Sequence, residues 1–339
     1  MRDPDTPELP VQAGIKDVAR AAAVSVSLVS LALNGRPGVS EATRAHIHSV
    51  AKELRYTANQ GARALRTGRS DTVGVLARNL SNPFFLDVLV AAQAEADTTR
   101  STIMMVDSHY SVERETEHLL HMAAQRFDGL AIAPTGSGSS IEVWQRQRPG
   151  TPVVVLNARA VELDGIVHVG PADDDAVDLA VRHLTSLGHR RIGMITAPSA
   201  VVADRSRLIA FQRYAERPEG REFSFIETAL DLDSVSETIL SLLLTPNPPT
   251  AVITSSDHTA QAVYAAAAMV GARIGRDLSV VGHDDLSTSA FLDPPLTTVR
   301  LSRSSIGRET LRRLLDASIT VNHVEPVQLI VRGSTAPPV

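Results

Sequence analysis

The 339-residue sequence contains no cysteine, which excludes a disulfide, a thiolate nucleophile and a thiolate metal site. It also lacks any uncharged apolar run of about 18 residues, the length that a membrane-spanning helix needs. The first ten residues, MRDPDTPELP, are acidic and proline-rich, whereas a secretory signal has a basic start followed by an apolar stretch. These absences predict a cytoplasmic protein with a disordered N-terminal tail over residues 1–13.

Aromatic residues make up only 4% of the chain, and Trp144 is its one tryptophan. Sugar sites often stack on aromatic rings, so this scarcity argues against a sugar ligand without excluding one. No nucleophile elbow with a Ser/His/Asp set is present, and the loop 135–140 lacks the lysine of a phosphate-binding loop. His118 and His121 share a helix face, but no third ligand is near in sequence, so we interpret them as surface histidines. We therefore expect no metal, no cofactor and no enzyme activity.

Positive charge is concentrated near the N-terminus. Residues 14–70 contain nine Lys/Arg and three acids, a balance of +6, while the whole chain carries −5 and the remainder therefore −11. This segregation favours contact with a phosphate backbone. On charge alone, a small solvated helical domain explains the pattern equally well.

Apolar residues in this basic segment follow helical spacing and predict three short helices. The sharp turn at residues 23–25 joins the first two, which is the geometry of a helix-turn-helix whose second helix enters the DNA major groove. We expect the Val29 and Leu33 side chains to be core. The three apolar stripes are Ile15, Val18 and Ala22; Val29 and Leu33; and Ile47, Val50, Ala51 and Leu54.

The larger part of the chain alternates short β-branched runs with helix-period segments, which predicts βαβ units and parallel sheets. Two groups of four strands predict two similar, doubly wound subdomains. The expected strands are 72–77, 102–106, 129–133 and 152–156, then 191–196, 223–228, 250–254 and 278–281.

Ligands of such sheets bind outside the carboxyl ends of the strands. Polar residues recur there in both halves, and each alone could simply cap a helix. Their convergence predicts a polar small ligand held between two subdomains that close about a hinge. These residues are Asp107, Thr135, Asn157, Pro198, Asp257 and the pair Asp284–Asp285.

Several motifs give the chain a resemblance to the LacI/GalR family of transcriptional regulators over residues 14–339. They include IKDVA (15–19), ARALRTGRS (62–70), NPFF (82–85), SVVGHDD (279–285) and PPLTTVR (294–300). The resemblance implies an α/β protein with an N-terminal helix-turn-helix headpiece and a periplasmic-binding-protein-like core of two doubly wound parallel-sheet subdomains. The implied divisions are a headpiece at 14–58, a hinge helix and linker at 59–70, and an effector-binding and dimerisation core at 71–339. Within the core, an N-subdomain covers about 71–160 and 302–325, and a C-subdomain about 161–301 and 326–334.

The family's DNA contacts map onto the headpiece and the hinge. Val26, Ser27 and Leu31 are implied to face base edges, and many members carry Arg where Leu31 stands, so we expect a different base preference here. Leu65 matches the leucine that wedges into the minor groove and kinks the DNA. The full implied DNA-binding set is Ser25, Val26, Ser27, Ser30, Leu31, Asn34, Arg44, Asn59, Ala62, Arg63 and Leu65.

The family's effector positions fall on Phe85, Asn157, Arg207, Asp257 and Asp284. Arginine with carboxyl or amide groups can bond sugar hydroxyls or an anionic group, and a phenyl ring supplies an apolar face. The resemblance therefore implies a small effector, a sugar or a related polar metabolite, bound between the subdomains.

The resulting hypothesis is a DNA-binding regulator, a repressor, whose affinity for a near-palindromic operator is set by that effector. The C-terminal residues 333–339 cannot form the heptad helix of family tetramers, so we expect a homodimer that binds double-stranded DNA and no membrane. A sugar-binding or transport protein without a regulatory role is the alternative, because the core alone would look the same. An enzyme on a doubly wound fold is the third class.

Overall fold

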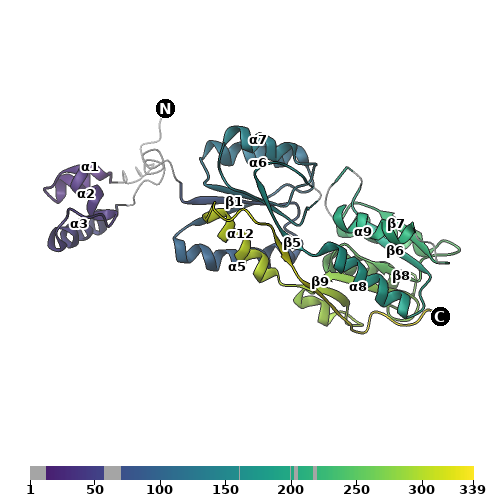
Figure 1. The fold of residues 1–339 in the computed structure, drawn as a ribbon. Coiled ribbons are helices and arrows are strands. Elements are labelled where there is room, and N and C mark those ends of the chain that lie inside the picture. Colours follow the sequence, from purple (N-terminus) through teal and green to yellow (C-terminus); the bar gives the residue numbers. More distant parts are fainter. Residues whose placement is uncertain (1–12, 57–69, 160, 199, 202–204, 217–219) are drawn as a thin grey trace, which may run out of the picture. The chain divides into compact units, whose positions relative to one another are not determined.

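The computed structural model describes residues 13–56, 70–159, 161–198, 200–201, 205–216 and 220–339 (Figure 1). The chain divides into two compact units, Met1–Ser70 and Asp71–Val339. The tail expected at 1–13 and the hinge expected at 59–70 lie almost wholly outside the described residues, and with them the hinge residues Asn59, Ala62, Arg63 and Leu65.

The described part of the first unit is a helix-turn-helix domain. Ser25 and Ser40 begin its second and third helices, since each hydroxyl accepts a bond from a backbone N–H three residues on. The three apolar stripes meet in one core, in which Val29 is fully buried and Leu33 partly buried, as expected. The helices are α1 (Ile15–Ala21), α2 (Val26–Leu33) and α3 (Glu41–Glu53).

The second unit contains, among its described residues, two six-stranded sheets. The first sheet is parallel throughout, in the order β11-β5-β4-β3-β1-β2. Helices α6 and α7 pack together over one face, and α5 and α12 over the other (Figure 1). Its strands are β1 (Thr72–Ala77), β2 (Thr102–Asp107), β3 (Gly129–Ile132), β4 (Val153–Leu156), β5 (Ile166–Pro171) and β11 (His323–Glu325). Its helices are α5 (Pro83–Thr99), α6 (Val112–Ala124), α7 (Ser139–Gln147) and α12 (Arg303–Leu315).

The second sheet has the order β12-β10-β9-β8-β6-β7 and is parallel except for β12, which runs antiparallel to β10. Helix α8 pairs with α9, and α10 pairs with α11. The strands are β6 (Arg191–Thr196), β7 (Glu222–Glu227), β8 (Ala251–Ile253), β9 (Ser279–Asp284), β10 (Thr297–Leu301) and β12 (Val327–Ile330). The helices are α8 (Asp173–Ser186), α9 (Arg205–Ala215), α10 (Leu232–Leu243), α11 (Asp257–Met269) and the 3-10 turn Ser287–Phe291.

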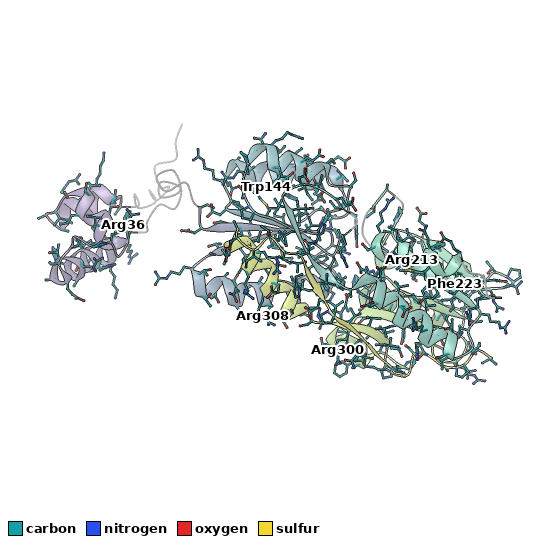
Figure 2. All side chains as sticks on the ribbon, viewed as in Figure 1. Arg36, Trp144, Arg213, Phe223, Arg300 and Arg308 are labelled. Atoms are coloured by element: carbon teal, nitrogen blue, oxygen red, sulfur yellow. The ribbon has the colours of Figure 1, made fainter. Side chains whose placement is uncertain are left out.

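Both sheets are covered on both faces, so their strands bury side chains on either side. In β8, Val252 packs into one apolar cluster while Ala251 and Ile253 pack into another. Trp144 on α7 is fully buried in the cluster beneath α6 and α7 (Figure 2). Strands without polar alternation are typical of buried parallel sheets. Within the described ranges, no helix has both the length and the apolar character to cross a bilayer.

The subdomain boundary expected at residues 160 and 161 is wrong. Strand β5 follows it, yet pairs with β4 in the first sheet, so the chain leaves the first subdomain only after Pro171. Four strands of the described structure, β5, β10, β11 and β12, were absent from the eight expected strands. The β5 sequence IVHVGP has a histidine, a glycine and a proline, which weaken the strand pattern. The chain returns to the first sheet after β10 and crosses back after β11.

Candidate nucleic-acid interface and ligand cavity

Helix α2 has a packed side and an open side. Val29 and Ala32 are buried against the headpiece core, whereas Ser27 is exposed and Val26 is 41% exposed. Ser30 and Leu31 are half-buried. The open side therefore carries short hydroxyls and aliphatic groups, which can contact base edges and thymine methyls without the bidentate bonds of arginine.

The two ends of α2 are fixed by side chains from the implied contact set. The Ser25 hydroxyl accepts a bond from the Leu28 N–H at 3.1 Å, which leaves its own proton available to a phosphate. Asn34, at the other end, donates from Nδ2 to the Ser30 carbonyl at 2.6 Å. Both exposed residues therefore have a capping role beside any DNA contact.

Arg44 on α3 also serves the end of α2. Its Nη1 donates to the Ala32 carbonyl at 2.7 Å, and its Nη2 donates to the Arg36 carbonyl at 2.8 Å. The sequence predicts a phosphate contact for this arginine, but two of its N–H groups are used inside the headpiece. We therefore infer that Arg44 positions the recognition helix, while its phosphate contact stays a prediction, because three of its five N–H groups remain for a phosphate.

A polar cavity of about 40 Å³ lies where the two sheets of the second unit present their strand ends and the loops that follow. Both subdomains contribute to it, as expected for a ligand site in paired doubly wound domains. The first subdomain supplies Arg78, Asn79, Asn82, Phe84, Phe85, Tyr110, Asn157 and Pro171. The second supplies Asp173, Ser206, Arg207, Leu230, Ser255, Ser256, His258, Thr259, His283 and Asp284.

Four of the five expected effector residues line this cavity: Phe85, Asn157, Arg207 and Asp284. Asp257 is not among the lining residues. Its carboxylate accepts bonds from the Leu286 N–H at 2.8 Å and from the Ser289 and Thr298 hydroxyls at 2.5 Å each. Because it is 1% exposed and holds the loop after β9, we assign Asp257 a structural role; Ser256 beside it lines the cavity instead.

Among the other strand-end residues of the sequence hypothesis, Asp107 and Thr135 also serve structure. Asp107 accepts bonds from the backbone N–H groups of Leu80 and His109. Thr135 donates its N–H to the buried Glu115 carboxylate at 2.7 Å. Neither lines the cavity, in keeping with the helix-cap and loop roles that such residues commonly have.

Backbone geometry at the end of β9 places Asp284 in the cavity wall. Its φ is 113°, a region that favours glycine, so the surrounding structure must hold it there. The Arg303 guanidinium does so by donating to the carbonyls of Asp284 and Asp285. The Asp285 carboxylate in turn pairs with Arg300 (Figure 2) and with Arg332, at 2.6 Å each.

Two opposite charges of the second subdomain lie close together in the cavity wall. Arg207 Nε lies 3.8 Å from the Asp173 carboxylate, and both side chains are nearly buried. Burial, together with the Arg207 charge, lowers the pKa of His283 well below its usual value, so this imidazole is neutral at pH 7. A neutral histidine can both donate and accept a hydrogen bond, which suits recognition of ligand hydroxyls.

Sequence reasoning missed Arg78 and Asn79, which directly follow β1. The signal was available, since they occupy the same strand-end position as Asn157 after β4. A second cleft, of about 450 Å³, adjoins the cavity and shares Asn79, Tyr110, Leu230 and His258 with it. Pro198, another strand-end residue of the hypothesis, lines this cleft.

Known proteins resemble both units. Residues 14–59 match the model described as bacterial regulatory proteins, lacI family, and residues 181–335 match a periplasmic binding protein-like domain. The HTH-type transcriptional repressor PurR of Proteus mirabilis is 29% identical over 326 residues, which cover 94% of this chain and 93% of PurR.

The chain is similar to regulators of the LacI/GalR family in both of its units. Among solved structures of the family, a lac repressor dimer bound to operator and the anti-inducer ONPF superposes with a TM-score of 0.82. It is 27% identical, with 96% of this chain and 99% of that chain covered. A complex of the regulator CelR with cellobiose has a TM-score of 0.68 at 25% identity, covering 95% and 99%. The helix-turn-helix and the paired sheets thus match LacI/GalR relatives along almost the whole chain.

Proposed function

We propose that this chain is a cytoplasmic transcriptional repressor that binds a near-palindromic operator as a homodimer and is controlled by a small effector. The observation that carries the proposal is the pairing, in one chain, of a helix-turn-helix with an open recognition helix and a core with a polar cavity lined by both subdomains. The lac repressor, a relative, was solved as a dimer on its operator. Two headpieces related by a twofold axis require two similar half-sites.

The proposed DNA contacts are Val26, Ser27 and Leu31 on base edges, with Ser25, Ser30 and Asn34 near phosphates. The hinge residues Asn59, Ala62, Arg63 and Leu65 extend this set on the family resemblance alone. The proposed effector contacts are Phe85, Asn157, Arg207 and Asp284, which line one cavity. A ligand that contacts both subdomains can shift the equilibrium between their arrangements only through its differential contacts with the two states.

No enzymatic role is part of the proposal, because the regulators that resemble the chain are named as repressors and the cavity lining is explained by ligand recognition. A sugar-binding protein without a regulatory role is the competing proposal. That competing proposal assigns no function to the helix-turn-helix.

DNA selection from a random duplex pool, with the full-length protein, tests the proposal. We expect one enriched motif with two inverted half-sites, and protection of both half-sites in a footprint. Enrichment of no motif would favour the binding-protein alternative. A separate screen of small metabolites by thermal shift would identify the effector, because a specific ligand raises the stability of the native state.

A further inference from the structure

Arg78 is a buried cation in the wall of the cavity. It is 6% exposed, lines the cavity directly after β1, and has its guanidinium carbon 5.9 Å from the centre of the Phe85 ring. Within the described parts of the chain, no atom accepts a hydrogen bond from its buried Nη1. A guanidinium cannot lose its proton in a protein, so a buried N–H without an acceptor destabilises the structure unless a ligand supplies one.

Nearby carboxylates are committed elsewhere. The buried Glu115 interacts electrostatically with Arg78, but its two oxygens accept bonds from the Thr135 N–H and the Ser140 hydroxyl. Asp173, across the cavity, lies beside Arg207. Among the described residues, none forms an ion pair with Arg78.

The volumes of the inner cavity and of the adjoining cleft fit a ligand that has a compact charged end and a larger polar body. A cavity of about 40 Å³ holds roughly three water molecules, which matches a small oxyanion and not a whole metabolite. The adjoining cleft of about 450 Å³ is within the range of small-molecule sites. A ligand can therefore place a compact charged end in the cavity and the rest of its body in the cleft.

We propose that the effector carries an anionic group, a carboxylate or a phosphate, that binds Arg78 in the inner cavity while its remaining polar groups face the cleft. Because an oxyanion accepts bidentate bonds from a guanidinium, it satisfies the buried Nη1 and balances the charge together. A neutral hydroxyl would satisfy the hydrogen bond but would add no negative charge to that of the buried Glu115. The proposal names the chemical class of the effector and so rests on the proposed function.

The test measures binding of sodium phosphate and of sodium acetate to the full-length protein by thermal shift, at constant ionic strength set with sodium chloride. We expect saturable stabilisation by at least one of the two anions. Arg78→Gln, which keeps a polar side chain without the charge, should weaken that binding by about tenfold or more. Arg146→Gln is the matched control, because Arg146 is a surface residue on α7 whose side chain is 65% exposed. It should bind the anion as the unmodified protein does.

The two anions distinguish an effector that carries a phosphate from one that carries a carboxylate. Stabilisation by phosphate alone indicates a phosphorylated effector, and stabilisation by acetate alone indicates a carboxylic acid. If Arg78→Gln does not fold, Arg78→Lys is the second variant, because it keeps the positive charge but loses the planar guanidinium that donates two bonds to one anion. We expect it to bind the same anion more weakly than the unmodified protein. Equal anion binding by the unmodified protein and the Arg78 variant would overturn the proposal, as would no response beyond that to chloride. Operator selection does not depend on this result, so a protein that selects an operator but binds neither anion would refute the anionic effector alone.

Discussion

Replacing Arg44 with alanine removes two hydrogen bonds that hold the end of the recognition helix. They run from Nη1 to the Ala32 carbonyl at 2.7 Å and from Nη2 to the Arg36 carbonyl at 2.8 Å. A hydrogen bond from a charged donor contributes about 1.5–3 kcal/mol. The first bond is partly buried and the second exposed, so we count the first in full and discount the second for solvent. The expected loss of local stability is about 2–3 kcal/mol.

Hydrogen exchange followed by mass spectrometry measures this loss in the full-length protein. Because each 1.4 kcal/mol corresponds to a factor of ten, amide protection in α2 should fall by roughly 30- to 150-fold in Arg44→Ala. Arg20→Ala is the control, since Arg20 is an exposed residue of α1 whose Nη1 bonds Asp17. It should leave α2 protection unchanged.

A salt titration of operator binding separates this positioning role from a phosphate contact. If Arg44 positions the helix, Arg44→Ala weakens binding at every salt concentration without altering the slope of log affinity against log salt. If it contacts a phosphate, the slope falls by about 0.9. Unchanged α2 protection together with a reduced slope would refute the positioning role and restore the original sequence prediction.

Leu65→Ala should weaken operator binding more than random-duplex binding, because a wedge acts only where the DNA centre kinks; equal losses in parallel titrations would rule out a minor-groove role. Arg207→Ala or Asp284→Ala should abolish the response of operator binding to the effector, and a normal response would remove that residue from the ligand site. Burial raises the pKa of Asp257 to about 6, so the folded protein holds this proton more tightly than the unfolded chain, and stability should fall as pH rises from about 4 to about 6. Urea unfolding should show a flatter profile over that window for Asp257→Asn, and identical profiles would contradict the burial argument. Light scattering should give the mass of a dimer, and a tetrameric mass would overturn the assembly proposed here.

The sequence was most informative where patterns are local. Helical spacing and the short turn at residues 23–25 predict the helix-turn-helix, and β-branched runs predict eight of the twelve strands that the described residues form. Strand β5 escaped because a histidine, a glycine and a proline interrupt its pattern, although neighbouring strands bury its last residues. Its omission placed the subdomain boundary too early.

The sequence predicted where the cavity lies but not which side chains line it. Strand-end logic found Asn157 and Asp284, yet it also selected Asp257, whose carboxylate turns inward to hold the loop after β9. Asp257 is the first residue of α11, and only the packed structure shows that the preceding Ser255 and Ser256 line the cavity instead. Arg78 stands at the same strand-end position as Asn157, so its place in the cavity was predictable, but its burial without a hydrogen-bond acceptor is visible only in the packed structure.

Anisotropy titration of the selected operator duplex and of a scrambled duplex, at one fixed salt concentration, tests the central claim most directly. A sequence-specific repressor should bind the operator about 10³-fold or more tightly than the scrambled duplex. The selected effector should change the operator affinity and leave the scrambled duplex affected far less. Equal affinity for both duplexes, unaltered by any ligand that stabilises the protein, would contradict the account of this chain as an effector-controlled regulator.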